Sequence, residues 1–279
     1  MKTCGHTMGV PDMPLAEAVA FFAEIGHDGI EIRCADDGQL QPERATDEEL
    51  SQVAEMMKAA GLEVACLTPY WGAWYTADER RASVEGLAAV ARAAARLGCR
   101  IVRVISGRWP VEGMSFREAL SMAAEGLREA GERAAEHGVT LAVETHGGQV
   151  AFNTEATLEL IEAVGHPAVG VLLDYYWLWV AGDDDPDECV PRLAGRIVHV
   201  HVKDGVRDGE RPRSVPLGEG QIPWPQVLAH LVRAGYDGFV SDEYEKKWRP
   251  ELPDPRVAMA ENARRLREWI AQAEQMAGR

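Results

Sequence analysis

Strand-like and helix-like segments alternate along this whole chain, and the alternation limits the folds that are open to it. The predicted strands are residues 3–6, 29–33, 62–67, 100–105, 140–144, 169–174, 197–202 and 238–243. The predicted helices are residues 14–25, 46–60, 78–97, 115–137, 154–164, 186–194, 224–234 and 255–276. Strict alternation predicts an α/β protein with a single closed (β/α)8 barrel, a TIM barrel, over residues 1–279. An open doubly wound sheet is the alternative, but the G-x-G-x-x-G motif that often marks one is missing after the first strand.

The composition indicates a chain that can bury a large core and does not bind nucleic acid. Hydrophobic residues make up 46% of the sequence. The formal net charge is −16, whereas phosphate contacts need a basic surface. Neither a long apolar span nor a basic-then-apolar leader is present, so we expect a cytoplasmic protein without membrane contact. The five cysteines are widely spaced and form no C-x-x-C pair, which argues against a disulfide framework and a thiolate zinc site.

One strand carries reactive side chains inside an apolar run. The alternation of residues 197–204 puts valines on one face and, on the other, His199, His201 and Lys203. A strand that is buried on both sides normally reads as a continuous apolar run. The polar face therefore indicates either hydrogen-bonded core histidines or a functional site.

Four polar side chains would meet at the carboxyl ends of consecutive barrel strands. They are Glu144, Asp174, His201 and Glu243. Strand alternation puts all four on the inward face, whereas the adjacent Asp242 would point toward the helices. The active site of a TIM barrel lies at this end, so the four residues form the candidate site.

Three carboxylates share a small space only where positive charge compensates their repulsion. A single divalent metal ion is the simplest source of that charge. Oxygen-rich ligation with one imidazole favours Mn²⁺, leaves Mg²⁺ and Co²⁺ open, and makes Zn²⁺ possible but less typical. The alternative is a carboxylate cluster neutralised by Lys203, Arg207 or Arg103.

Six short segments carry a resemblance to a known family. They are GIEIR at 29–33, VETHGG at 143–148, GVLLD at 170–174, HVHVKD at 199–204, LGEG at 217–220 and GYDGFVSDE at 235–243. In order and spacing they resemble the xylose-isomerase-like TIM barrels, which include ketose 3-epimerases, hydroxypyruvate isomerases and inosose dehydratases or isomerases. The resemblance implies that Glu144, Asp174, His201 and Glu243 bind one divalent metal ion.

The resemblance also implies a reaction, which is proton abstraction next to a carbonyl. The metal would polarise the carbonyl of a sugar, keto-sugar or cyclitol and stabilise an enediolate. One of two catalytic carboxylates, Glu144 or Glu243, would take the proton, and the other carboxylate or a water would return it. Return of the proton elsewhere gives the isomerase or epimerase that we expect. Loss of a neighbouring hydroxyl or alkoxy group gives the alternative, a dehydratase or lyase.

Seven further side chains are candidates for substrate binding. They are His6, Tyr70, Trp71, His146, Trp177, Lys203 and Arg207. Arg207 lies six residues after His201, as does the substrate-binding arginine of the ketose 3-epimerases. Trp177 and Val150 instead replace a histidine and a glutamate of that group, which argues against a ketose 3-epimerase in the strict sense.

Two of these candidates have a second interpretation. His146 could shuttle a proton or bind a hydroxyl, or it could be an ordinary loop histidine. Lys203 could supply positive charge near the reacting oxygen, or it could pair with Asp204 or Glu219.

Two groups of rim and barrel residues also leave alternatives open. The aromatic segments 70–75 and 175–179 follow predicted strands and could pack on a sugar ring or form the interface of a homo-oligomer. Glu31, Arg33 and Arg103 share inward parity and could pair with one another below the site or bind substrate hydroxyls.

Two other classes of protein fit less well. A phosphodiesterase that resembles the repair endonucleases of this fold would need additional histidine and aspartate ligands and a basic surface. One complete ligand set and a net charge of −16 argue against that class. A non-catalytic sugar-binding barrel would bind its ligand without a metal.

Overall fold

Eight parallel strands close into a barrel, as the sequence predicts. The structure, a computed structural model, describes residues 1–209 and 212–278. Around the barrel the strands follow the order β1-β10-β7-β6-β5-β4-β3-β2. They are β1 Lys2–His6, β2 Gly29–Arg33, β3 Glu63–Thr68, β4 Ile101–Val104, β5 Thr140–Glu144, β6 Val169–Asp174, β7 Ile197–Val202 and β10 Phe239–Asp242. The prediction of a single (β/α)8 barrel fold is confirmed.

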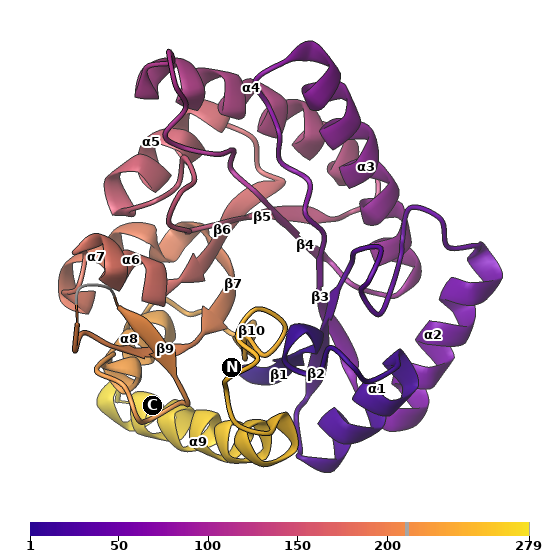
Figure 1. Cartoon of the computed structure of the whole chain (residues 1–279), viewed down its shortest axis with the longest axis vertical. Coiled ribbons are helices and arrows are strands. Elements are labelled where there is room, and N and C mark those ends of the chain that lie inside the picture. The colour runs from indigo at the N-terminus through magenta and orange to yellow at the C-terminus, as the bar shows by residue number, and fades with distance from the viewer. Residues whose placement is uncertain (210–211, 279) are drawn as a thin grey trace.

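Helices form a ring outside the barrel (Figure 1). They are α1 Leu15–Glu24, α2 Asp47–Ala60, α3 Ala77–Arg96, α4 Phe116–Ala135, α5 Thr154–Val164, α6 Tyr175–Ala181, α7 Pro186–Leu193, α8 Trp224–Arg233 and α9 Pro255–Met276. Most match the predicted segments because the sequence marks their ends. Thr46 and Glu49 form a capping box at the start of α2, and Gly61 ends that helix with a φ of 71°, a conformation that suits a residue without a Cβ.

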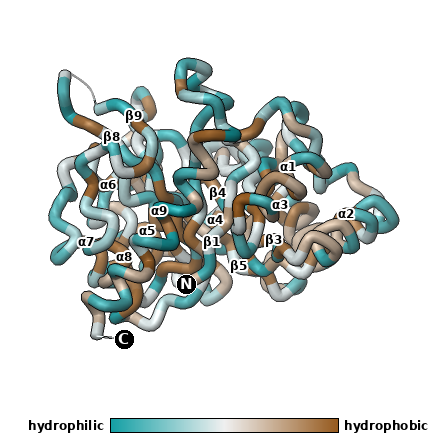
Figure 2. The backbone as a smooth tube through the Cα atoms, turned by 90° about the horizontal axis from the view of Figure 1, so that it is seen from below, coloured by the Kyte–Doolittle hydropathy of each residue, from teal (hydrophilic) through white to brown (hydrophobic). Residues whose placement is uncertain are grey.

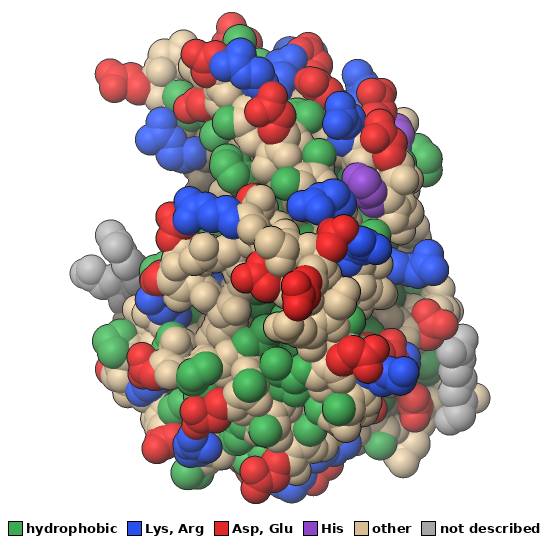
Figure 3. Space-filling model, turned by 90° about the vertical axis from the view of Figure 1, so that its right-hand side faces the viewer, with side chains coloured by type: hydrophobic (Ala, Val, Ile, Leu, Met, Phe, Trp, Pro, Cys, Tyr) green, Lys and Arg blue, Asp and Glu red, His purple; other side chains and the backbone are tan. Residues whose placement is uncertain are grey.

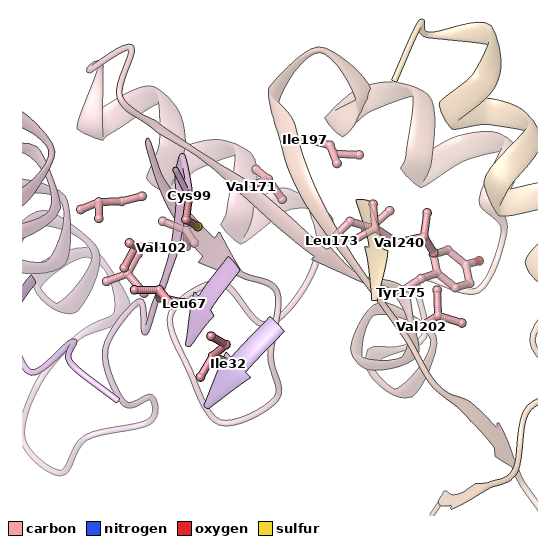
Figure 4. Packing of buried hydrophobic residues seen from close by; sticks show 14 of the residues in the cluster. Ile32, Leu67, Cys99, Val102, Val171, Leu173, Tyr175, Ile197, Val202 and Val240 are labelled. Atoms are coloured by element: carbon pink, nitrogen blue, oxygen red, sulfur yellow. The ribbon is translucent and has the colours of Figure 1, made fainter. Parts of the chain in front are cut away.

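The core lies mainly between the outer face of the barrel and the helices. Ile30 and Ile32 point outward from β2 and are fully buried. Figure 4 shows two groups of such side chains, one around Ile32 and Val102 and another around Leu173 and Val240. Because these apolar residues alternate with inward-facing ones, their burial sets which face of each strand looks into the barrel.

The structure adds two elements that the sequence interpretation missed. The described residues form nine α-helices rather than eight, because the aromatic segment after β6 is the helix α6 and not a rim loop. Tyr175 and Tyr176 of this helix are buried, so they are not free to contact substrate or a second subunit. A small antiparallel hairpin, β8 Asp204–Val206 with β9 Arg213–Val215, follows β7. It projects on the opposite side of the barrel from the two termini (Figure 2).

The visible surface mixes both signs of charge. On the face in Figure 3, lysine and arginine side chains are interspersed with acidic ones and no basic stripe is seen. Among the described helices, none is long and apolar enough to cross a membrane.

A buried histidine at the amino end of β2 makes the fold sensitive to acid. His27 is 5% exposed and packs edge-on against Phe22, with 5.8 Å between the ring centroids. Neither ring nitrogen has a hydrogen-bond partner among the described residues. Burial, aided by the nearby Arg267, lowers the pKa of His27 to about 4.

We predict that His27→Leu makes the protein less sensitive to falling pH. Between a pKa of about 6.5 for the unfolded chain and about 4 for the folded one, the unfolded chain binds a proton that the folded one does not, so stability falls as pH drops. From neutral pH to about pH 4, the wild type should lose up to about 3 kcal/mol more unfolding free energy than the variant in urea titrations. His137→Gln, at an exposed position, should follow the wild type. A pH-independent difference between wild type and His27→Leu would contradict this account.

Candidate metal centre

Four consecutive barrel strands bring together the residues of the candidate metal centre. Glu144 ends β5, Asp174 ends β6, His201 lies near the end of β7, and Glu243 directly follows β10. Asp174 pairs in register with His201, which in turn pairs with Ser241. Each of the four contributes a ligand atom, and these atoms lie within 4.8 Å of one another. Asp242, the neighbour of Glu243, points outward instead and accepts hydrogen bonds from Asn262 on α9.

Several buried atoms of this centre lack a hydrogen-bond partner. Both carboxylate oxygens of Asp174, Nδ1 of His201 and Oε2 of Glu243 have none among the described residues, although Oδ2 of Asp174 and Oε2 of Glu243 are ion-paired with Lys203. Buried polar atoms normally have partners, so Oδ1 of Asp174 and Nδ1 of His201 are unusual. The donor set of three carboxylates and one imidazole nitrogen fits a divalent metal ion.

Lys203 supplies positive charge next to these carboxylates. Its Nζ lies 2.8 Å from Oδ2 of Asp174, 2.8 Å from Oε2 of Glu243 and 3.4 Å from Oε1 of Glu245. The side chain is only 4% exposed and lies above the rings of Tyr176 and Trp177. Lys203 therefore pairs with the metal-centre carboxylates rather than with Asp204 or Glu219.

The pKa shifts in the centre follow its crowded charges. Burial raises the pKa of Asp174 well above its usual range, and the neighbouring Glu243 and Glu144 raise it further. Burial would raise the pKa of Glu144 as well, but Arg103 and His201 hold it well below the usual value. Burial would lower the pKa of His201, but Glu243, Glu31 and Glu144 raise it well above the usual value. The site thus stabilises positive charge at its centre.

Glu31 lies beneath the centre and pairs with the histidines of β7. Its two oxygens lie 2.9 Å from Nε2 of His201 and 2.9 Å from Nε2 of His199. Nε2 of His6 lies 3.5 Å from the same carboxylate, and Thr68 donates a hydrogen bond to it. The expected pairing of Glu31 with Arg33 or Arg103 is wrong, because this carboxylate pairs with histidines of β7 and β1 instead.

The two arginines reach the upper part of the site by separate contacts. Arg103 donates to Oε2 of Glu144 through Nε at 2.9 Å and through Nη2. Arg33 pairs with Asp37 and donates from Nε to the hydroxyl of Tyr70 at 3.0 Å. Both guanidinium groups lie about 5.5 Å from the centre of the Tyr70 ring. Tyr70 is thus held over the barrel by two buried cations.

Trp248 is a rim residue that the sequence interpretation missed. Its side chain is 54% exposed, and its ring stands edge-on to that of Tyr70, with 6.5 Å between the ring centroids. The guanidinium of Arg33 lies over the Trp248 ring. The segment that carries it has no helix or strand pattern, so the only signal in the sequence is the tryptophan itself, which follows the last predicted strand at the end where the site lies.

His146 and Trp177 form a second wall of the site. Their rings lie 4.3 Å apart, and Nδ1 of His146 lies 2.5 Å from the carbonyl of Gly147. If Nδ1 carries the proton and donates to that carbonyl, Nε2 is left as an acceptor. Burial lowers the pKa of His146, as do the cations Lys203 and Arg103, which favours the neutral ring. Trp177 lines an apolar pocket of about 360 Å³ together with Trp109, Phe152 and Val180.

The other three substrate-binding candidates do not lie beside the candidate ligand atoms at the mouth of the barrel. His6 is buried in the barrel interior, where Nδ1 accepts a hydrogen bond from the backbone of Met8. The ring of Trp71 covers Gly86 on α3, and its Nε1 donates to Glu43. Arg207 stacks on Trp179 and pairs with Asp184 at 2.7 Å. The structure brings Lys203, His146, Trp177 and Tyr70 to the candidate site, whereas Trp71 and Arg207 lie apart from it. His6 lies next to Glu31, with its ring centroid 5.8 Å from that of His201.

We predict that Lys203→Met destabilises the metal-free protein more than the metal-loaded one. Loss of one partner from a buried ion pair costs about 3–5 kcal/mol. A bound dication would replace the missing charge, so excess Mn²⁺ should reduce that cost. Urea unfolding with chelator and with Mn²⁺ measures both values. An equal loss under the two conditions would contradict the role of Lys203 as the charge that balances these carboxylates.

Comparisons with known proteins agree with this fold. A protein of Streptomyces coelicolor named "Putative hydroxypyruvate isomerase" is 27% identical over 252 residues, covering 84% of this chain and 86% of its own length. The 3-dehydroshikimate dehydratase of Bacillus anthracis is 25% identical over 245 residues, covering 82% of this chain and 84% of its own length. A solved structure titled as the IOLI protein with a binding zinc atom has a TM-score of 0.81 at 19% identity, covering 98% of this chain and 99% of the other. The family model for the xylose isomerase-like TIM barrel matches residues 19–271, and the chain belongs to that family.

Proposed function

We propose that this protein is a divalent-metal-dependent isomerase or epimerase that acts on a sugar, keto-sugar or cyclitol. The observation that carries the proposal is the convergence of Glu144, Asp174, His201 and Glu243, whose buried ligand atoms lie within 4.8 Å of one another. The names of the relatives support a reaction at carbon next to a carbonyl, since they include an isomerase and a dehydratase.

The four residues would hold one divalent ion, and Mn²⁺ is our first choice. Three carboxylates and one imidazole suit Mn²⁺, Mg²⁺ or Co²⁺, while the zinc of the IOLI structure keeps Zn²⁺ open. When bound, the ion supplies a Lewis acid that polarises a carbonyl oxygen and stabilises the negative charge that develops there.

Glu243 is the better candidate for the proton-transferring base. Arg103 donates to Glu144 twice and holds that carboxylate in its ionised form, which makes Glu144 a weak base. Burial would raise the pKa of Glu243, but His201 and Lys203 hold it below the usual value, so the choice rests on access: Glu243 is the most exposed of the four candidate ligands, at 7%. It would take the proton next to the carbonyl, while Glu144 stays in place as a ligand.

His146 would relay a proton on another side of the substrate. As a neutral ring whose Nδ1 donates to the Gly147 carbonyl, it must first accept a proton at Nε2, from a substrate hydroxyl or a water, before it can return one. Lys203 would neutralise the charged base and the developing oxyanion. Tyr70 and Trp248 offer aromatic faces at the rim for the apolar side of a sugar ring.

The second candidate is a dehydratase or lyase that uses the same residues. The similarity to the 3-dehydroshikimate dehydratase, over 82% of this chain, favours it. In that case the proton that Glu243 takes from carbon would pass, directly or through Nε2 of His146, to a leaving hydroxyl, which departs as water, rather than back to carbon. The base and the carbonyl site are unchanged, so the two reactions differ in where this proton goes.

We predict that the Mn²⁺-loaded protein exchanges a substrate proton with solvent deuterium and that Glu243→Gln slows this exchange by about 10²–10⁴-fold. The Gln side chain keeps the shape but cannot accept the proton. Ketoses, inososes and keto-glycosides are incubated in D₂O and followed by NMR and mass spectrometry, which separate isomerised products from products that have lost water or an alcohol. Asp242→Asn, which removes a carboxylate that points away from the site, serves as control. Full exchange in Glu243→Gln, with Mn²⁺ still bound, would contradict the assignment of the base.

A further inference from the structure

We infer that Glu31 is the positioning residue of the metal centre and that it acts by orienting the imidazole of His201. The inference rests on the proposed function, since it presupposes that His201 is a metal ligand. Glu31 lies on β2, 170 residues from His201, and only the closed barrel brings them together.

The two ring nitrogens of His201 face different groups. Nε2 lies 2.9 Å from Oε1 of Glu31, below the centre. Nδ1 faces the centre, 3.3 Å from Glu144 and 3.2 Å from Glu243, without a hydrogen-bond partner. A carboxylate accepts but does not donate, so Nε2 must carry a proton toward Glu31. Nδ1 is then the nitrogen that can offer its lone pair to a metal ion.

Contacts on all sides fix the Glu31 carboxylate itself. It is 0% exposed, and it accepts from His199 through its second oxygen and from Thr68 through its first. His6 approaches the same oxygen at 3.5 Å, with its own ring fixed by the backbone of Met8. Because a buried carboxylate is stable only when its oxygens are paired, these donors hold it in one orientation. The face of β7 that carries two histidines therefore serves two purposes, since His199 anchors Glu31 and Glu31 anchors His201.

The test compares Co²⁺ affinity in variants that remove different parts of this arrangement. Glu31→Gln keeps the size but loses the charge that makes the His201 ring a strong ligand, and it can satisfy only one of the two β7 histidines with its oxygen. We expect Co²⁺ affinity to fall by about 10–100-fold in calorimetric titration of the chelator-treated protein. His199→Gln can still donate to Glu31, so its affinity should stay within about threefold of the wild type.

A matched control separates positioning from a general loss of stability. Asp242→Asn also replaces a buried carboxylate near the centre, but one that points to Asn262 on α9. It should bind Co²⁺ as the wild type does, whatever its thermal stability. In the Zn²⁺-loaded wild type, the Nε2 protons of His199 and His201 should resonate downfield, and both should shift upfield in Glu31→Gln.

The outcomes separate this inference from the proposed function. Wild-type protein that binds no divalent ion would overturn the metal centre itself. Wild-type protein that binds Co²⁺, with Glu31→Gln equal to it, would overturn only the positioning role. An equal loss of affinity in Glu31→Gln and Asp242→Asn would also overturn it, since the loss of any buried carboxyl group near the centre would then have the same effect.

Discussion

The repulsion among three buried carboxylates is the constraint on which the rest of this structure depends. Glu144, Asp174 and Glu243 stand on strands that the barrel places side by side, and their ligand atoms come within 4.8 Å of one another together with that of His201. Such a group is stable only beside positive charge. Lys203 and Arg103 provide it from within the chain. Oδ1 of Asp174 and Nδ1 of His201, which have no hydrogen-bond partner among the described residues, point to a further cation.

The barrel satisfies this constraint through strand register. Apolar residues such as Ile30, Val171 and Val240 pack against the helices, which fixes the inward face of each strand. The same register then sets the height at which each polar side chain lies. Glu31 occupies the layer below the ligands, and its contacts with His199 and His201 connect β2 with β7 across the interior. The alternation of apolar and polar side chains along each strand therefore determines both the packing of the barrel and the position of the site residues.

The barrel and the four residues of the candidate site could be predicted from the sequence, because the alternation of side chains along a strand is a local signal. Alternation in β5, β6, β7 and β10 selects the inward residues, and it excludes Asp242, which the structure pairs with Asn262. Partners across the barrel could not be predicted in this way. Glu31 meets histidines that lie 168 and 170 residues away, and Arg103 meets Glu144 rather than Glu31. Composition also misled the interpretation of residues 175–179, since aromatic residues after a strand suit a rim loop as well as the buried helix α6.

The metal content of purified protein tests the central claim most directly. Wild type and Asp174→Asn are compared by elemental analysis after expression with added Mn²⁺, since both oxygens of Asp174 are buried and Oδ1 has no hydrogen-bond partner among the described residues. Our account predicts about one divalent ion per wild-type chain and its loss in a folded Asp174→Asn variant. Wild-type protein that holds no divalent ion and takes up none on titration would contradict the account, and the carboxylates would then be balanced by Lys203 and Arg103 alone.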